Sequence, residues 1–488
     1  MKKAIIIGSG IGGLASALRM RHKGYEVEVI EQNGYPGGKL TELRADGYRW
    51  DAGPSLFTMP HLVTELIELF GRDVNEYFSY NRQEEVCRYW WEDGMTFTVD
   101  ADPSTFINDA ASTFSIDPSR LHQYLKDSRF KYDHTSPLFL ERSLHKASTY
   151  LSKDTLKALV NVGRMDLSKS LHDYNLQMLE EPHLVQLFDR YATYNGSSPY
   201  QTPGIMSMIP HLEMDIGTYF PEGGMHSITQ ALYNLAVDVG IAFRWNHAVD
   251  QIIIENRKAK GVRIKNEILK ADVVISNMDI HPTYNKLLSD VSPPRNTLTQ
   301  ERSSSALIFY WGVKGIHEHF GLHNILFSGQ YRSEFESLFD RYEIGDDPTV
   351  YINITSKIES VDAPPGNENW FVMINAPGDY GQRWDELILQ ARAKIIDKIE
   401  RLTGRPLSEH IVTERVLDPR SIASKTSSHQ GALYGSSSND RMAAFLRHPN
   451  FHRRIPNLFF CGGSVHPGGG IPLCLLSGKI VSELAPTP

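Results

Sequence analysis

The sequence predicts an α/β fold, because a glycine-rich turn joins a strand to a helix near each end of the chain. Near the start, the apolar run 3–7 is typical of a buried parallel strand, and helical spacing over 11–23 and a second strand at 27–30 follow it. Near the end, a strand at 458–461 leads through a glycine-rich bend into a helix over 471–484. We therefore expect both units to share one parallel sheet, with further layers formed by the segments between them.

Length and composition exclude several classes of protein. The 488 residues correspond to about two to four domains. Apolar residues make up 41% and charged residues 22% of the chain, as in ordinary globular proteins, so wholesale disorder is excluded. The net charge of −8 leaves no chain-wide basic surface for a phosphate backbone, and we expect no nucleic-acid partner.

Cysteine usage and hydropathy favour a cytoplasmic location. The 3 cysteines are widely spaced and odd in number, so neither a disulfide framework nor a cysteine-rich zinc site is expected. The first apolar run stops at Gly8, which is too short for a signal peptide. No window holds the roughly 20 apolar residues that cross a bilayer. We expect a soluble or peripherally membrane-associated protein of the reducing cytoplasm.

The first glycine-rich turn has the G-x-G-x-x-G spacing of a dinucleotide-binding loop. Its first glycine permits a tight turn, its second lets a pyrophosphate approach the backbone, and its third lets the helix pack closely. Glu31 ends the second strand, 18 residues beyond Gly13, where a carboxylate accepts hydrogen bonds from ribose hydroxyls and repels a 2′-phosphate. FAD or NAD fits this pattern and NADP does not, with a purely structural turn as the alternative. The predicted nucleotide contacts are Gly8, Ser9, Gly10, Gly12, Gly13 and Glu31.

A second glycine-rich loop distinguishes FAD from NAD. Gly37 and Gly38 precede a predicted hairpin (41–44 and 48–51), which runs into the segment 51–55, DAGPS. This pattern resembles the flavoprotein family of amine oxidases and phytoene-type carotenoid desaturases, whose second loop runs beside the flavin. Two ordinary surface turns are the alternative. The resemblance implies FAD as the cofactor, with contacts at Gly38, Lys39, Leu40, Pro54, Ser55 and Leu56.

The segment 457–471, NLFFCGGSVHPGGGI, carries the most specific pattern in the chain, because it resembles the signature of bacterial-type carotenoid (phytoene) desaturases. The N-terminus of a helix that begins at about Ile471 can face the pyrimidine end of an isoalloxazine, where charge accumulates on reduction. Val465 stands where the family more often has Thr or Ala, which favours the hydroxycarotenoid-desaturase branch. The implied flavin contacts are Gly462, Gly463, Gly470, Ile471 and Pro472.

A central segment also matches this family. A PEGGM turn at 221–225 leads into a predicted helix at 227–240 and a predicted strand near 248–254. The resemblance implies that the backbone of Val249 contacts adenine and that Asn277 lies beside the cofactor. Ordinary strand and loop positions are the alternative for both residues.

The cofactor domain is therefore expected to be discontinuous. The β-rich runs 86–91, 96–99, 307–313, 350–354 and 370–376 predict an antiparallel sheet, and 383–402 predicts an amphipathic helix. We expect a Rossmann-like FAD-binding domain (1–70, 215–295 and 440–488), an antiparallel β-sheet substrate domain (71–104 and 296–439) and a helical lid or membrane-contact region (105–214). Residues 126–169 hold nine basic and five acidic side chains, a local balance of +4. Such a surface suits an anionic membrane, with a solvated helical lid as the alternative.

The sequence offers few candidates for a metal site or an acid–base residue. His448 and His452 are four residues apart, but Pro449 disfavours the helix that would aim both at one ion, so no metal is expected. By ungapped comparison with phytoene desaturases, Asp154 falls where that family has a proposed acid–base aspartate. A solvated helix carboxylate is the alternative at this position.

The resemblance implies an FAD-dependent carotenoid desaturase, which introduces a C=C bond next to a conjugated polyene by hydride transfer to flavin. The 3,4 bond of a 1-hydroxycarotenoid is the favoured target. The expected partners are the carotenoid, a membrane surface, and quinone or oxygen as the electron acceptor. The alternatives are a phytoene desaturase, an amine oxidase and a non-catalytic prenyl-lipid carrier on the same fold.

Overall fold

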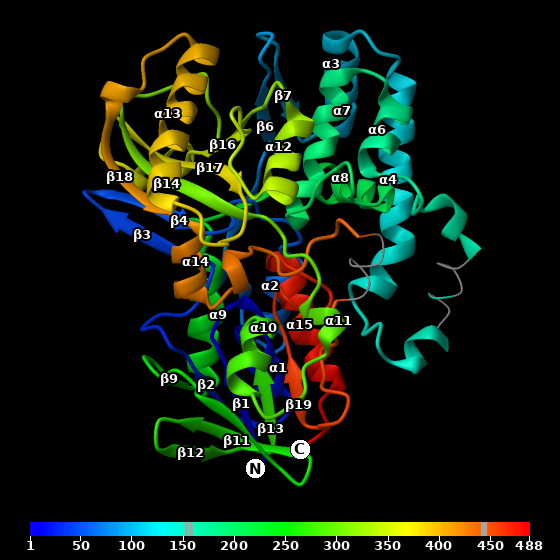
Figure 1. The fold of residues 1–488 in the computed structure, drawn as a ribbon, viewed down its shortest axis with the longest axis vertical. Helices are drawn as coiled ribbons and strands as arrows, with labels where there is room; N and C mark the ends of the chain where they lie inside the picture. The colour runs from blue at the N-terminus through cyan, green and yellow to red at the C-terminus, as the bar shows by residue number, and fades with distance from the viewer. Residues whose placement is uncertain (152–154, 156–159, 441–446) are drawn as a thin grey trace.

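A five-stranded parallel sheet brings together three distant parts of the chain. It occupies the lower part of the molecule in Figure 1, the computed structural model of the protein, which describes residues 1–151, 155, 160–440 and 447–488. Its strands, in spatial order, are β19 (Leu458–Phe460), β13 (Val273–Ser276), β1 (Lys3–Ile7), β2 (Glu26–Ile30) and β9 (Ala242–Arg244). Most of these residues are buried, as expected for parallel strands covered on both faces.

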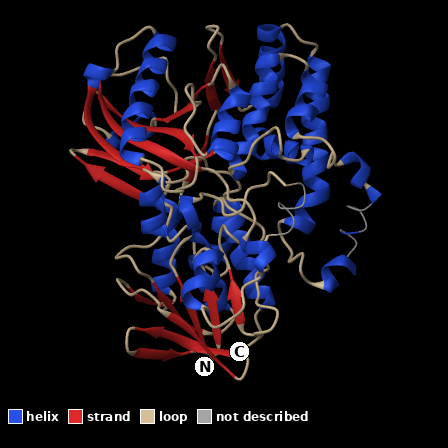
Figure 2. Cartoon of the chain, viewed as in Figure 1, coloured by secondary structure: helices blue, strands red, loops and turns tan. Residues whose placement is uncertain are grey.

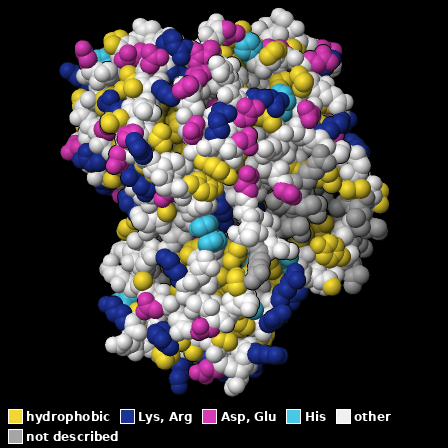
Figure 3. Space-filling model, in the orientation of Figure 1, with side chains coloured by type: hydrophobic (Ala, Val, Ile, Leu, Met, Phe, Trp, Pro, Cys, Tyr) yellow, Lys and Arg dark blue, Asp and Glu magenta, His cyan; other side chains and the backbone are white. Residues whose placement is uncertain are grey.

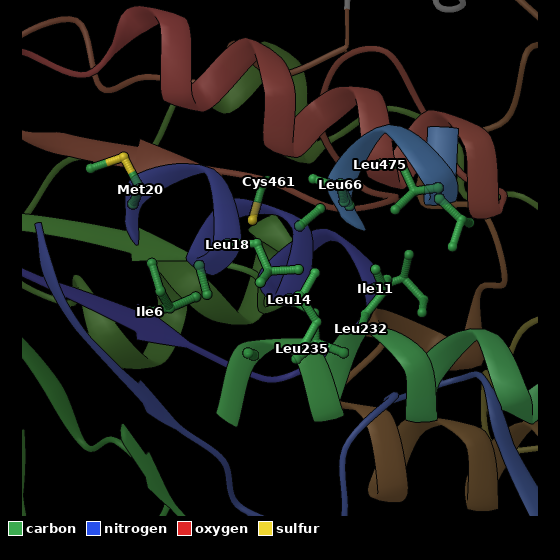
Figure 4. Close-up of a cluster of buried hydrophobic side chains, with 14 of the residues drawn as sticks. Ile6, Ile11, Leu14, Leu18, Met20, Leu66, Leu232, Leu235, Cys461 and Leu475 are labelled. Atoms are coloured by element: carbon green, nitrogen blue, oxygen red, sulfur yellow. The ribbon is translucent and has the colours of Figure 1, made fainter. Parts of the chain in front are cut away.

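Four helices pack beside this sheet and form its largest apolar core. They are α1 (Ile11–His22), α2 (His61–Glu68), α9 (His226–Asp238) and α15 (Ile471–Leu484). Figure 4 shows Leu14 and Leu18 of α1 near Leu232 and Leu235 of α9, with Leu475 of α15 in the same cluster. The N-terminal and C-terminal helices therefore share one core, although they are separated by most of the chain.

A small antiparallel sheet extends the cofactor half at the lower edge of Figure 1. It consists of β10 (Gln251–Glu255), β11 (Lys258–Ile264) and β12 (Glu267–Lys270). The strand predicted near 248–254 begins three residues later, at Gln251. The preceding loop is instead held at the end of β2, where the backbone N–H of His247 donates to the carbonyl of Glu31 at 2.9 Å.

A seven-stranded sheet dominates the inserted part of the chain. Its strands, in spatial order, are β18 (Ile411–Leu417), β14 (Ser305–Lys314), β17 (Asn367–Ala376), β16 (Val350–Asn353), β15 (His323–Leu326), β6 (Glu85–Trp90) and β7 (Thr96–Asp100). One face packs on α13 (Trp384–Thr403), the predicted amphipathic helix, through Leu307, Phe309 and Trp311. Because side chains alternate along a strand, Ile308 and Tyr310 point to the opposite face.

This sheet departs from the antiparallel prediction in one place, because β6 and β15 run parallel. Parallel neighbours need a long crossover, and the chain between these two strands includes most of the helical layer. That layer lies beside the sheet in Figure 2. It contains α3 (Pro103–Phe114), α4 (Pro118–Phe139), α6 (Leu171–Leu179), α7 (Pro182–Asp189), α8 (Ile209–His211) and α12 (Tyr331–Glu336).

Short elements join the two halves. They are β3 (Thr41–Ala45), β4 (Tyr48–Ala52), β5 (Tyr80–Arg82), β8 (Tyr219–Pro221), α10 (Ile280–Pro282), α11 (Arg295–Leu298) and α14 (Pro419–Thr426). β3 and β4 form the predicted hairpin, and β5 pairs with β8. Across the residues described, no helix combines the length and the apolar character needed to cross a bilayer.

Candidate cofactor and substrate site

A cavity of about 1000 Å³ lies where the parallel sheet meets the seven-stranded sheet, and residues from both chain ends line it. Most of the predicted cofactor residues are among them. They are Gly8, Gly10, Gly12, Glu31, Gly38, Lys39, Leu40, Pro54, Ser55, Leu56, Val249, Asn277, Gly462, Gly463, Gly470, Ile471 and Pro472. Ser9 and Gly13 are buried behind this wall.

The carboxyl ends of three adjacent parallel strands place the glycine-rich segments in contact. Gly8 follows β1, Asn277 follows β13 and Gly462 comes shortly after β19. A Cβ atom on Gly10 would lie 2.7 Å from Asn277 Nδ2, and one on Gly12 would lie 3.0 Å from the backbone nitrogen of Gly462. This edge of an open α/β sheet, where the strand order reverses, is where nucleotides bind.

Two helix N-termini open into the same cavity without a side-chain cap. The N-cap residues are Gly10 for α1 and Gly470 for α15, and neither first turn carries an acidic residue. The unpaired backbone N–H groups and the positive ends of both helix dipoles favour negative charge. The site therefore suits a pyrophosphate at α1 and a ring that gains negative charge at α15.

Glu31 is held rigidly at the end of β2. Its Oε2 accepts hydrogen bonds from the backbone N–H and the hydroxyl of Ser9, at 2.8 and 2.9 Å, and its Oε1 accepts from the backbone N–H of Asn33 at 2.9 Å. An ionised carboxylate has about four acceptor positions, so acceptor capacity remains for ribose hydroxyls. Ser9 thus orients Glu31 from behind the cavity wall.

Lys39 ties the second glycine-rich loop to the chain before the C-terminal segment. Its Nζ donates to the carbonyls of Ala432 and Leu433, both at 2.8 Å. Burial lowers the pKa of Lys39 to about 8, although the nearby Asp279 opposes this shift. The lysine fixes the loop that carries Leu433 and Tyr434, two further residues of the cavity wall.

The far wall of the cavity belongs to the inserted part of the chain. The seven-stranded sheet supplies an aromatic and apolar surface that consists of Ile308, Tyr310, Ile325, Tyr351, Phe371 and Met373. The helical layer supplies Arg190 and Glu213, whose Nη2 and Oε1 atoms are 2.5 Å apart. The hydroxyl of Tyr191 donates to the same Oε1 at 2.9 Å.

Sequence reasoning missed these wall residues. Arg190 and Glu213 are 23 residues apart and lie on separate short elements, so no local motif marks them. The alternation of apolar residues along the predicted strands was the only signal for the aromatic wall. Asp154, the predicted acid–base residue, lies outside the described residues. Within the described ranges, no group of three His, Cys, Asp or Glu side chains is arranged to hold a metal ion.

A parallel nucleotide-binding sheet, two uncapped helix N-termini at one cavity and an inserted sheet that closes the cavity define an FAD-dependent oxidoreductase fold. The chain matches the family described as flavin containing amine oxidoreductase over residues 11–485. The protein belongs to this family, and FAD is its cofactor. The α/β fold class and the flavin predicted from the sequence are thereby confirmed.

Individual relatives show which members of the family the chain resembles. The chain is 54% identical over 486 residues to the 1-hydroxycarotenoid 3,4-desaturase of Flavobacterium sp. (strain P99-3), with 100% of this chain and 99% of the relative covered. It is 30% identical to the 4,4'-diapolycopene oxygenase of Methylomonas sp, with 99% and 97% covered. Among solved structures, an oxidoreductase from Methanosarcina mazei has a TM-score of 0.65 at 17% identity, with 99% and 100% covered. The predicted resemblance to carotenoid desaturases is confirmed.

Proposed function

We propose that this protein is an FAD-dependent carotenoid desaturase that acts on the 3,4 bond of a 1-hydroxycarotenoid. The 54% identity to a 1-hydroxycarotenoid 3,4-desaturase over the full length supports this substrate. The observation that carries the proposal is a cavity that extends from the glycine-rich loops to an apolar and aromatic wall. A long hydrocarbon matches such a wall better than an amine does, because charged amines need polar partners when buried.

The protein's own residues bind the cofactor, orient the substrate and exclude water from the cavity. When bound, FAD supplies the hydride acceptor that no amino-acid side chain provides. Glu31 and the N-terminus of α1 are suited to the ribose and the phosphates, and the N-terminus of α15 to the pyrimidine end of the ring. The sheet wall around Tyr310 and Phe371 excludes water and aligns the polyene against the flavin-facing loops. An acid–base role for Asp154 stays a prediction.

Product spectroscopy with the purified FAD-loaded enzyme tests the proposal. We expect a 1-hydroxylated carotenoid to gain one conjugated double bond, seen as a shift of its absorption to longer wavelength, when quinone or oxygen is supplied. Anaerobic assays with and without quinone identify the electron acceptor. Turnover of phytoene alone would favour a phytoene desaturase, and turnover of amines alone an amine oxidase. A colourless protein that does not take up FAD would indicate a lipid carrier.

We also propose that the protein acts at the cytoplasmic surface of a membrane, where carotenoids reside. Three apolar side chains close together in sequence are solvent-exposed: Tyr150 (56%), Val160 (77%) and Val162 (49%). The basic residues Lys146 and Arg164 flank them and are also exposed. Apolar side chains also reach the surface along the right flank of Figure 3, beside the helical layer.

Sedimentation with lipid vesicles measures this contact. We expect the protein to bind vesicles that contain anionic phosphatidylglycerol, and high salt to weaken binding because it screens the basic residues. The double substitution Val160→Asp and Val162→Asp should reduce binding at least fivefold without loss of FAD. Equal recovery of the wild type and this variant in the vesicle pellet would contradict the proposal.

A further inference from the structure

A row of hydrogen-bonded polar side chains crosses the part of the cavity wall that the seven-stranded sheet supplies. The hydroxyls of Ser55 and Tyr351 are 2.7 Å apart, and the Tyr351 hydroxyl is 2.8 Å from Nδ1 of His323. Asn353 completes the row, with its Nδ2 3.2 Å from the same Nδ1. Ser55, Tyr351 and His323 all line the cavity.

The row follows from strand register. His323 on β15 pairs with Asn353 on β16, and Tyr351 lies two residues before Asn353, on the same face. Ser55 reaches this face from the loop after β4, within the 54–56 segment predicted to contact the flavin. The polar row therefore connects the sheet wall to the flavin-facing end of the cavity.

The hydrogen-bond directions along this row are determined by its last member. Asn353 Nδ2 also lies 3.0 Å from the carbonyl of Leu322, which only accepts, so this atom is a donor. His323 Nδ1 must therefore accept, and the ring proton is on Nε2. Burial lowers the pKa of His323 to about 3, which keeps the ring neutral. The Tyr351 hydroxyl then donates to His323, and Ser55 donates to Tyr351.

This arrangement leaves hydrogen-bonding capacity at the cavity. Among the residues that the structure describes, His323 Nε2 and Ser55 Oγ make no hydrogen bond besides those named. His323 is only 4% exposed. Nε2 opens into the cavity, where a donor without a partner costs free energy once a ligand displaces the water around it. This donor beside Ile325 therefore suits a polar group on the ligand.

The proposed substrate has such a group in the required place. In a 1-hydroxylated end group, three single bonds of about 1.5 Å separate the oxygen from C3, one carbon of the bond that is oxidised. The oxygen therefore lies within roughly 4 Å of the reacting bond, and its partner must lie at the flavin-facing end of the cavity. Ser55 and the row behind it meet this condition.

We propose that Ser55, Tyr351 and His323 form a recognition site for the tertiary hydroxyl of the substrate, an inference that rests on the proposed function. His323 Nε2 donates to the hydroxyl oxygen, and Ser55 anchors the Tyr351 hydroxyl that orients the imidazole. Tyr351 and Asn353 are positioning residues, because they hold the imidazole in this role. An end group without oxygen would leave the His323 Nε2 donor unpaired.

The test compares a 1-hydroxylated carotenoid with the same carotenoid carrying hydrogen at C1. We expect the wild-type FAD enzyme to prefer the hydroxylated compound in kcat/KM at least 100-fold, because a site built for a hydroxyl rejects an analogue without one. His323→Leu should lower kcat/KM for the hydroxylated compound at least 30-fold and change that for the other compound less than threefold. Tyr351→Phe should act in the same direction more weakly.

Two further variants separate recognition from folding. His323→Gln keeps an N–H donor and should recover part of the preference. Tyr89→Phe changes a buried tyrosine of the neighbouring strand β6, outside the cavity wall, and should leave the preference at its wild-type value. Flavin absorbance and melting temperature show whether each variant is folded and loaded.

The possible outcomes are distinguishable. Equal losses on both carotenoids in His323→Leu, or a wild type without preference, would overturn the recognition site and leave the desaturase assignment in place. A wild type that oxidises neither compound would refute the proposed function instead. In that case, dissociation constants from flavin absorbance changes still test the site, since it requires tighter binding of the hydroxylated compound and loss of that difference in His323→Leu.

Discussion

Replacing Gly13 by valine is expected to abolish FAD binding and to destabilise the protein. A Cβ atom at this position would lie 2.1 Å from the carbonyl oxygen of Gly8, and that backbone cannot move without distorting the nucleotide-binding turn. Overpacking of this kind typically costs about 1–3 kcal/mol. Displacement of α1 also moves its N-terminus away from the phosphates. We expect at least 100-fold weaker binding of FAD, measured by titration of the apoprotein.

Gly163→Ala is the matched control for this substitution. A Cβ atom on Gly163 would meet nothing within 4 Å, so its stability should change by less than about 0.5 kcal/mol and its FAD content should be normal. Wild-type FAD affinity in Gly13→Val would show that the turn does not need the close approach of helix and strand.

Acidification from pH 6.5 to pH 5 is expected to lower the free energy of unfolding by several kcal/mol. Burial lowers the pKa of His323 and His448 to about 3 and that of His466 to about 4. The unfolded chain takes up these protons near pH 6.5, whereas the folded protein stays neutral until pH 4 or below. The contribution of these neutral histidines to the free energy of unfolding is therefore fully present well above pH 6.5 and declines as the pH falls. At pH 5 the loss is about 2 kcal/mol for each of the three histidines.

Denaturant unfolding of the FAD enzyme at pH 6.5 and pH 5 measures the change in the free energy of unfolding. A substitution of His448 isolates the part of this change that comes from one histidine. His448 packs edge-on against Phe460, with ring centroids 4.9 Å apart, and its Nε2 lies 3.1 Å from the Tyr284 hydroxyl. His448→Phe keeps the ring packing and loses this hydrogen bond at both pH values, so the difference between the two pH values reports the titration of His448. In His448→Phe, the pH-dependent loss should be about 2 kcal/mol smaller than in the wild type. His122→Gln, at an exposed position, should leave the loss unchanged. An identical pH dependence in the wild type and His448→Phe would show that His448 does not contribute to the loss of stability in acid.

Several features could be predicted because they depend on neighbouring residues. The helix over 471–484 occurs with those bounds, since Pro472 suits a first turn and the apolar spacing is regular. The hairpin at 41–52 follows from its turn at Asp46 and Gly47, both with positive φ. The bounds were less accurate where a distant contact intervenes, as before β10, where a hydrogen bond to the Glu31 carbonyl holds the preceding loop.

The sequence by itself determined the nucleotide-binding turn, the acidic residue that ends β2 and the C-terminal flavin segment. Each of these is a steric or electrostatic requirement met within about thirty residues, so spacing reveals it. Only the tertiary structure decided that β6 lies parallel to β15, that Arg190 meets Glu213, and that Ser55 meets Tyr351 across 296 positions. Such contacts depend on sheet register and on the packing of separate layers, which no local pattern of side chains specifies.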